Sequence, residues 1–519
     1  MKDQLALLPG YLTAHLQLVL VALLLGVAVS IPAGIWVTRR RSLEPGVLGV
    51  ASVIQTIPSL ALLAIMVPAL AALGTFTASL GLELRSIGYL PAIVALTLYS
   101  ILPILRNTVT GIESVDPALV EAARGVGMTD RQRLRQVELP LALPVIVAGV
   151  RTAAVWVVGT ATLSTPVGAT SLGNYIFSGL QTRNTAAVLV GCVAAALLAL
   201  ALDQTIRLLE TGAGRRDRRR LAAGLAVLVG LYGYTAVSFA AGRSAAGAGP
   251  PVRIGAKAFT EQYILSEMLA QLVRRETGLS TEIVPSLGST VAFDALRAGD
   301  LDLYVDYSGT IFATIMQRTD AFVGRDTVLA EVERFLVEEH GIRSAGALGF
   351  QNTYALGMSS EVARRLSVRG ISDLVRVAGR LEIGGDYEFF QRTEWAALVD
   401  AYGLAFARQR SMDPALMYEA VRNGDVDVIS AFSTDGRIAA YGIVLLEDEK
   451  GVIPPYDALV LAGPALVERA PEVLEAVSRL AGALDEQTMQ RLNLAVDRDK
   501  RAPAQVAREF LAAQDAAAQ

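Results

Sequence analysis

The sequence predicts a helical membrane domain followed by a two-lobed α/β domain. Three observations lead to this fold class. The 519-residue chain is 53% hydrophobic with a mean hydropathy of +0.44, and its apolar excess is concentrated before about residue 241. From Val252 onward, short apolar strands alternate with helical patterns, as in α/β lobes. A short pattern in this second half also recurs further along the chain, which indicates a duplicated lobe.

Overall charge and the rare residue types exclude several kinds of protein. A formal charge of −4 offers no basic face for nucleic acid. The only cysteine, Cys192, lies in an apolar run, so we expect no intrachain disulfide. His15 and His340 are too isolated to suggest zinc, and we expect no metal and no cofactor. GxxxxGK[ST], HExxH and GxSxG motifs are absent from the sequence, so we do not expect an enzyme.

Six apolar stretches are long enough to cross a bilayer. The second carries Pro58 and Pro68, so we expect it to be kinked or broken. Arginine clusters follow the first, third and fifth stretches, and with six spans all of them lie on one side. By the positive-inside rule this side is the cytoplasm, which leaves everything after Ala240 outside. The expected spans are 16–36, 47–73, 89–105, 144–162, 186–209 and 221–240.

The charged stretch 121–140 is expected to project from the membrane into water. Gly127 can end one helix in a left-handed conformation, Thr129 can cap a second, and Pro140 can begin the return to the bilayer. The spacing resembles the EAA loop of ABC-importer permeases, with Val137 where isoleucine is usual. The resemblance implies a type I importer permease that forms a homodimer and docks on a separate ATPase through Glu121, Ala122, Ala123, Gly127, Leu139 and Pro140. The alternative is an amphipathic loop without a partner.

The loop 166–177 mixes glycine, proline and hydroxyl residues with apolar ones. It resembles the outer gate of osmoprotectant permeases, although Thr170 and Ser171 replace two of the usual glycines. Two interpretations of this loop remain, an outer gate and an ordinary extracytoplasmic loop.

We expect a permease domain at 1–212, then a basic loop, the sixth helix and a flexible linker at 213–251. The binding domain is expected at 252–519, with lobe 1 at about 252–353 and 460–519 and lobe 2 at about 354–459. The linker 241–251 is rich in small residues and should keep the second domain near the membrane. No cleavable signal is evident, so we expect a multi-pass protein of the cytoplasmic membrane with an extracytoplasmic domain.

The internal repeat pairs residues 293–302 with residues 418–427 without gaps. Each copy is expected to form a helix end, a glycine turn and the start of a strand. A second pair joins 253–255 to 382–384. Two such lobes joined by crossing strands form a cleft that can close by a hinge motion.

Four stretches of the second half resemble the binding proteins of glycine betaine, carnitine and choline importers. They are 254–263, 300–310, 352–356 and 433–438. The same family includes ergothioneine importers in which a permease is fused to a binding domain. The resemblance covers nearly the whole chain and implies a two-lobed, type II periplasmic-binding-protein fold and a small trimethylammonium ligand.

Aromatic faces recognise a quaternary ammonium group, which cannot donate a hydrogen bond. Arg392 is the candidate for a ligand carboxylate, because its fork can bind two oxygens. Thr260, Ser289, Thr290 and Thr434 add hydroxyl groups near predicted helix starts and cleft loops. The ring candidates at predicted cleft loops are Tyr304, Tyr307, Tyr354, Tyr387, Trp395 and Phe432.

Two alternatives stay open at these positions. Each aromatic can instead be a core residue, and Arg392 can instead pair with Glu388 or Glu394 at the surface. Arg392-Thr-Glu-Trp395 departs from the family's usual Arg-x-Asp-Gly-Tyr, and Phe432 stands where tyrosine is frequent. Ergothioneine therefore stays an alternative ligand, and a membrane-tethered sensor stays an alternative function.

Overall fold

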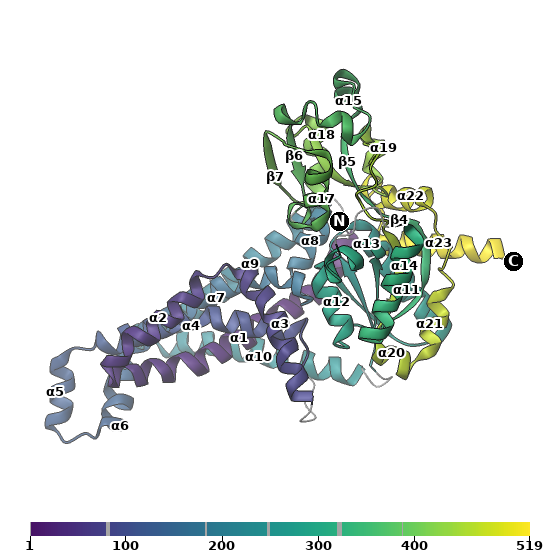
Figure 1. Cartoon of the computed structure of the whole chain (residues 1–519). Coiled ribbons are helices and arrows are strands. Elements are labelled where there is room, and N and C mark those ends of the chain that lie inside the picture. The colour runs from purple at the N-terminus through teal and green to yellow at the C-terminus, as the bar shows by residue number, and fades with distance from the viewer. Residues whose placement is uncertain are drawn as a thin grey trace. The chain divides into compact units, whose positions relative to one another are not determined.

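The computed structural model describes residues 2–78, 84–181, 184–245, 250–318, 324–386 and 388–518. The chain divides into two compact units, a helical one within residues 1–247 and an α/β one that includes residues 248–519. Figure 1 labels elements of both units where there is room.

The helical unit consists of long apolar helices and a short helical loop. Its elements are α1 (Lys2–Arg39), η1 (Arg41–Leu43), α2 (Glu44–Thr56), α3 (Ser59–Ala78), α4 (Tyr89–Glu113), α5 (Pro117–Gly125), α6 (Asp130–Arg133), η2 (Leu134–Glu138), α7 (Leu139–Ala161), η3 (Thr162–Val167), α8 (Gly173–Gln181), α9 (Thr185–Arg215) and α10 (Arg218–Ala245).

Among the described residues, five helices are long and apolar enough to cross a membrane, and one bent pair makes a sixth candidate. The two helices of this pair meet at 100°, so the predicted break in the second span is confirmed. Pro58 explains the bend, because Ile57 before it is extended, with ψ of 127°. The hydroxyl of Tyr99 donates to the carbonyl of Ile57 at this break.

Helices α1 and α4 pack closely because α1 has glycine where the two backbones approach. A Cβ on Gly26 would lie 1.9 Å from Ser100 Oγ, and one on Gly34 would lie 2.7 Å from Thr108 Cγ2. Small residues of this kind allow membrane helices to approach each other.

The expected linker at 241–251 is partly wrong. Helix α10 continues to Ala245, and residues 246–249 lie outside the described ones. Alanine and arginine favour a helix, so the last span extends past the predicted boundary.

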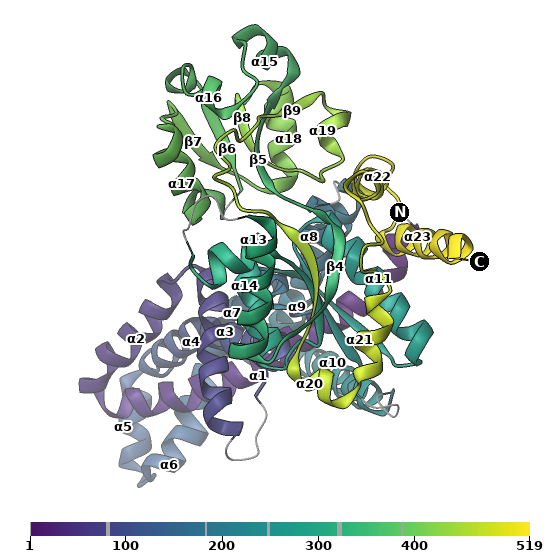
Figure 2. The same cartoon turned by 45° about the vertical axis from the view of Figure 1, so that its right-hand side comes forward.

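The α/β unit contains two five-stranded sheets, one in each lobe (Figure 2). The first sheet has the order β2-β1-β3-β10-β4 and the second has the order β7-β6-β8-β5-β9. The strands are β1 (Val252–Lys257), β2 (Thr281–Leu287), β3 (Leu303–Tyr307), β4 (Arg343–Gln351), β5 (Tyr354–Ser359), β6 (Glu382–Gly385), β7 (Arg408–Ser411), β8 (Val428–Phe432), β9 (Ile443–Leu445) and β10 (Asp457–Ala462).

Helices cover the sheets and join their strands. They are α11 (Thr260–Thr277), α12 (Ser289–Arg297), α13 (Ser308–Thr310), η4 (Ile311–Ile315), α14 (Arg325–His340), α15 (Ser360–Leu366), α16 (Ile371–Leu374), η5 (Ala378–Arg380), η6 (Phe389–Gln391), α17 (Thr393–Tyr402), α18 (Pro414–Asn423), α19 (Arg437–Ala440), α20 (Pro464–Arg469), α21 (Pro471–Ser478), α22 (Glu486–Asp497) and α23 (Pro503–Ala518).

The chain crosses twice between the two lobes. It leaves the first sheet after β4 and returns between β9 and β10, which pairs antiparallel with β3 and β4. We propose 252–353 and 457–519 as lobe 1 and 354–456 as lobe 2.

The predicted internal repeat is confirmed by equivalent hydrogen bonds in the two lobes. Asp302 Oδ2 accepts from Arg253 N at 2.7 Å, and Asp427 Oδ2 accepts from Glu382 N at 2.8 Å. Each aspartate lies between a helix and the middle strand of its sheet, β3 or β8. The same arrangement of helix, turn and strand is therefore present in both lobes.

Candidate functional site

Four aromatic rings form a row where the two lobes meet. Phe259, between β1 and α11 of lobe 1, stacks on Phe432 of lobe 2, with ring centroids 5.9 Å apart and planes 3° apart. Tyr307 lies 6.2 Å from Phe259, and Tyr354 lies 4.9 Å from Phe432. Tyr354 and Phe432 meet because they are opposite each other in the β5–β8 register. The row brings together three of the predicted rings and adds Phe259.

The rings fill the space between them. A cavity of about 20 Å³ lies beside Phe259 and Phe432, which is room for about one water molecule. A ligand can enter this part of the junction only if the two rings move apart.

A buried carboxylate holds the junction together. Glu261, 2% exposed, accepts hydrogen bonds from Tyr307 Oη at 2.5 Å and from Thr434 Oγ1 of lobe 2 at 2.5 Å. Asn352 and Asn493 donate to the same carboxylate at 3.0 and 3.2 Å. Burial raises the pKa of Glu261, and the hydrogen bonds from Thr434 and Tyr307 oppose this effect. Glu261 thus links the aromatic row, the first crossing segment and both lobes.

Arg392 lies over the face of Tyr354, with its Cζ 5.1 Å from the ring centroid. Its guanidinium donates to Glu388 Oε2 at 2.7 Å and to Thr314 Oγ1 of lobe 1 at 3.0 Å, and it lies 3.6 Å from Glu394 Oε1. Arg392 therefore pairs with both glutamates, as in the alternative interpretation, and its own side chain is 7% exposed whereas that of Glu388 is 49% exposed. No described residue accepts a hydrogen bond from its Nε. This atom is a free donor beside an aromatic face.

A second buried ion cluster lies next to the row. Thr260 Oγ1 donates to Asp497 Oδ1 at 2.6 Å, and Arg437 pairs with Asp435 at 2.5 Å. Burial raises the pKa of Asp497 to about 6, while the Arg437 charge opposes the rise. Thr260 is therefore engaged in holding α11 to α22.

Several predicted site residues lie away from the row. Tyr304 is fully buried in the first sheet and donates to Asp306 at 2.6 Å. Trp395 packs against Phe389, Phe390 and Phe406 in the core of lobe 2. These two positions favour a packing role, because Tyr304 is held by Asp306 within the first sheet and Trp395 is in contact with three phenylalanine rings.

The remaining predicted residues differ in their surroundings. Ser289 Oγ donates across the lobes to Glu388 Oε2 at 3.4 Å. Thr290 is exposed. Tyr387 lies outside the described residues.

Sequence reasoning missed Phe259 and Glu261 as junction residues. Both lie in the stretch 254–263 that carries the family resemblance. The resemblance pointed to this stretch, but it did not indicate which of its side chains reach the junction. It also missed Tyr456, which is fully buried and donates to Glu394. Nothing in the sequence distinguishes Tyr456 from a core tyrosine.

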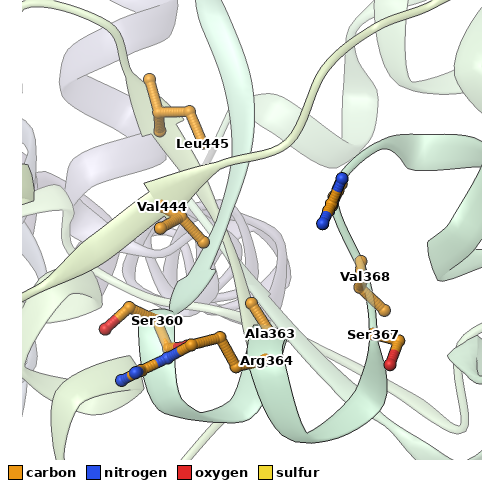
Figure 3. A pocket seen from close by; sticks show the side chains of 8 residues that line it. Ser360, Ala363, Arg364, Ser367, Val368, Val444 and Leu445 are labelled. Carbon is orange, nitrogen blue, oxygen red and sulfur yellow. The ribbon is translucent and has the colours of Figure 1, made fainter.

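A further cavity, of about 440 Å³, lies in lobe 2 between α15 and β9 (Figure 3). Its lining includes Arg364, Val368 and Val444 but no aromatic ring. It therefore lacks the groups that recognise a quaternary ammonium ion.

The loop between α4 and α7 has the predicted helix-turn-helix form. Gly127 has φ of +80°, and its N–H donates to Arg124 O at 2.9 Å, which ends α5. Thr129 and Gln132 form a capping box at the start of α6. Of the predicted docking residues, Glu121, Ala122, Gly127 and Pro140 are exposed, whereas Ala123 is buried and Leu139 is partly buried.

A buried ion cluster connects this loop to α1. Glu138, 3% exposed, pairs with Arg39 at the end of α1 and with Arg133 Nε at 2.8 Å. Arg133 also pairs with the exposed Asp130 at 2.9 Å. The loop is therefore tied to two long helices, α1 through Arg39 and α7 through the continuous chain.

Both halves of the chain match known families. Residues 250–513 match the substrate binding domain of ABC-type glycine betaine transport systems, and residues 30–214 match the binding-protein-dependent transport system inner membrane component. The ergothioneine transport permease/ergothioneine binding protein EgtU of Helicobacter pylori is 30% identical over 477 residues, covering 89% of this chain and 82% of that protein.

Two relatives each match one half. The choline transport system permease protein OpuBB of Bacillus subtilis is 40% identical over 211 residues, covering 40% of this chain and 90% of that protein. The carnitine transport binding protein OpuCC of Listeria monocytogenes is 34% identical over 264 residues, covering 50% of this chain and 85% of that protein.

A helical permease continuous with a two-lobed solute-binding domain defines a transporter subunit of the binding-protein-dependent importers. Within this class, the chain belongs to the ABC importers of the glycine betaine type, as a permease fused to its substrate-binding domain.

Proposed function

We propose that this chain captures and translocates a small quaternary-ammonium solute that also carries a carboxylate. The observation that supports this proposal best is the aromatic row beside Arg392 at the junction of the lobes. Each desolvated ring contributes about 0.5–2 kcal/mol to binding a cation. The guanidinium of Arg392 supplies the complementary contact for a carboxylate.

Binding requires the lobes to separate and close again. Phe259 and Phe432 are in contact, so a trimethylammonium group must displace one ring from the other. We propose that the crossing segments, Asn352–Thr353 and 446–456, act as the hinge. Thr434 would then release Glu261 on opening and bond to it again on closure. The proposed ligand contacts are Phe259, Tyr307, Tyr354, Arg392, Phe432 and Thr434. Tyr387, which lies outside the described residues, remains a further candidate from the sequence.

Ergothioneine is the second candidate ligand. EgtU, whose name gives ergothioneine as its ligand, is similar to this chain across both halves. Ergothioneine combines a trimethylammonium group and a carboxylate with a flat imidazole ring. The parallel stack of Phe259 and Phe432 would suit such a ring once the two are separated.

The chain requires partners for active transport. We propose that the binding domain lies outside the cytoplasmic membrane and that two copies of the permease form one translocation path. A separate ATPase subunit would dock on α5, α6 and Pro140, and ATP-driven movement there would open the path to the cytoplasm. The exposed side chains of Leu119 and Val126, 48% and 75% exposed, give this loop an apolar contact surface.

Binding and uptake assays test the proposal in two steps. Calorimetry of the full chain in nanodiscs should detect binding of glycine betaine, carnitine, proline betaine or ergothioneine, and Phe432→Leu should weaken it. Binding of none of them would contradict the proposed ligand class. Uptake of the bound solute into proteoliposomes that contain the ATPase would separate an importer from a sensor, because a sensor would bind without uptake.

A further inference from the structure

Three ionisable side chains meet on the apolar surfaces of α7 and α9. Arg151 of α7 places Nε 3.1 Å from Glu210 Oε2 and 3.8 Å from Asp203 Oδ1, both on α9. Their side chains are 31%, 24% and 26% exposed, respectively. No hydrogen bond from a described residue reaches Glu210 Oε2.

The cluster extends from the end of the two helices into the expected membrane spans. Arg151 lies seven residues after Pro144, where the expected span of α7 begins, and Asp203 lies six residues before Leu209, where the expected span of α9 ends. Six or seven residues of helix span about 10 Å, and the apolar core of a bilayer is about 30 Å thick. The two ends are neighbours, because a Cβ on Gly214 of α9 would lie 3.8 Å from Pro144 of α7. Arg151 and Asp203 thus both lie about 10 Å inside the expected apolar core, counted from that end.

Lipid is an unsuitable neighbour for this surface. Ionised groups within transmembrane segments almost always face a protein interior or a water-filled cavity, and they mark substrate or ion paths. Helix α9 is weakly covered by the rest of its own chain, since only 17% of its most apolar 18-residue stretch is buried. The part-exposed charges therefore point to a surface that a single copy leaves open.

The uncovered charges define one face of α9. Asp203 and Glu210 are seven residues apart, which places them on nearly the same side of a helix. Continuing that spacing toward the other end gives Ala196 and Leu189, and both are exposed. The next residue after Ala196, Leu197, is 61% exposed but is turned by about 100° around the helix.

We propose that the face of α9 formed by Leu189, Ala196, Asp203 and Glu210, together with Arg151, lines a water-filled translocation path that a second copy of this chain closes. The Arg151–Asp203–Glu210 cluster is a transient site for a zwitterionic solute during passage. The solute carboxylate contacts Arg151, and its cationic group contacts the two acidic side chains. The proposal rests on the importer function proposed above and adds a ligand-contact site in the membrane half.

Thiol labelling tests the water-filled path without knowledge of the ligand. Cys192 is the only cysteine, so Cys192→Ser gives a background without thiols. Ala196→Cys and Leu197→Cys are then compared in the full chain, in nanodiscs and together with the ATPase, using a trimethylammonium-ethyl methanethiosulfonate. We expect Ala196→Cys to react at least tenfold faster than Leu197→Cys. Equal rates, a faster Leu197→Cys, or no reaction at either position would overturn the path.

Reagents of opposite charge test the cluster. In the Ala196→Cys background, Arg151→Gln should slow the anionic sulfonatoethyl reagent at least threefold relative to the cationic one, and Asp203→Asn should do the reverse. An unchanged ratio in both variants would overturn the zwitterion site and leave the cluster a structural ion pair. If the labelling results are as expected but no betaine is taken up, the proposed substrate class is wrong and the proposed water-filled path is retained.

Discussion

Replacing Glu138 by glutamine should disconnect the α5–α6 loop from α1 while leaving solute binding intact. The buried carboxylate is shared by Arg39 and Arg133, so its neutralisation leaves two guanidinium groups without a charge between them. Breaking a buried pair costs about 3–5 kcal/mol. The Arg39 side chain is 35% exposed and partly screened by water, so we expect the lower end of this range. About 3 kcal/mol corresponds to a roughly hundredfold larger population of the detached loop.

Asp130→Asn is the matched control for this variant. Asp130 also pairs with Arg133, but its side chain is 87% exposed, and such pairs contribute about 0–1 kcal/mol. Trypsin cleavage at Arg131 and Arg135 reports the exposure of the loop, and uptake in proteoliposomes with the ATPase reports its coupling. We expect fast cleavage and low uptake for Glu138→Gln, with near-normal values for Asp130→Asn. Similar cleavage and uptake in the two variants would refute the idea that the buried carboxylate transmits movement to α1.

Three further outcomes are expected. Phe432→Leu keeps an apolar side chain but removes the ring, so the Kd for a trimethylammonium solute should rise about 2–30-fold in calorimetry; Tyr304→Phe, in the sheet core, should leave it unchanged. Gly127→Val forces a β-branched residue into a left-handed conformation and should abolish uptake without changing solute affinity, and normal uptake would contradict a docking role for this turn. Burial raises the pKa of Asp497 from 3.8 to about 6, so the folded state holds this proton more tightly than the unfolded state. Its contribution to the unfolding free energy is present below pH 4 and is lost as the pH rises through 6, by roughly 3 kcal/mol. Asp497→Asn should remove this fall in urea unfolding of residues 252–519 followed by Trp395 fluorescence, and an unchanged pH profile would contradict the assignment.

Local chemistry made much of the permease predictable. The apolar helices, the break at Pro58, the left-handed Gly127 and the cap at Thr129 depend on neighbours within a few residues, and all of them are found in the structure, although the helices are longer than the predicted spans. The helical extension to Ala245 was missed because the composition of a flexible linker and that of a helix end overlap. Glu138 was seen only as a loop charge, because its burial depends on Arg39, which lies 99 residues away.

The site was less predictable because it depends on long-range pairing. The repeat predicted two lobes, and the register of β5 and β8 then brings Tyr354 to Phe432. Trp395 was a ring candidate at a predicted cleft loop, yet it packs inside lobe 2 against three phenylalanines. Its sequence neighbourhood gives no sign of which face of α17 is turned inward.

The position of β10 has a consequence for biosynthesis. Lobe 2 is one continuous segment whose last strand, β9, ends at Leu445, whereas the first sheet lacks the strand between β3 and β4 until Ala462 has been made. During synthesis from the N-terminus, the later lobe can therefore complete its sheet before the earlier one. We expect released chains truncated after residue 456, the end of lobe 2, to contain a protease-resistant second lobe beside an unfinished first lobe.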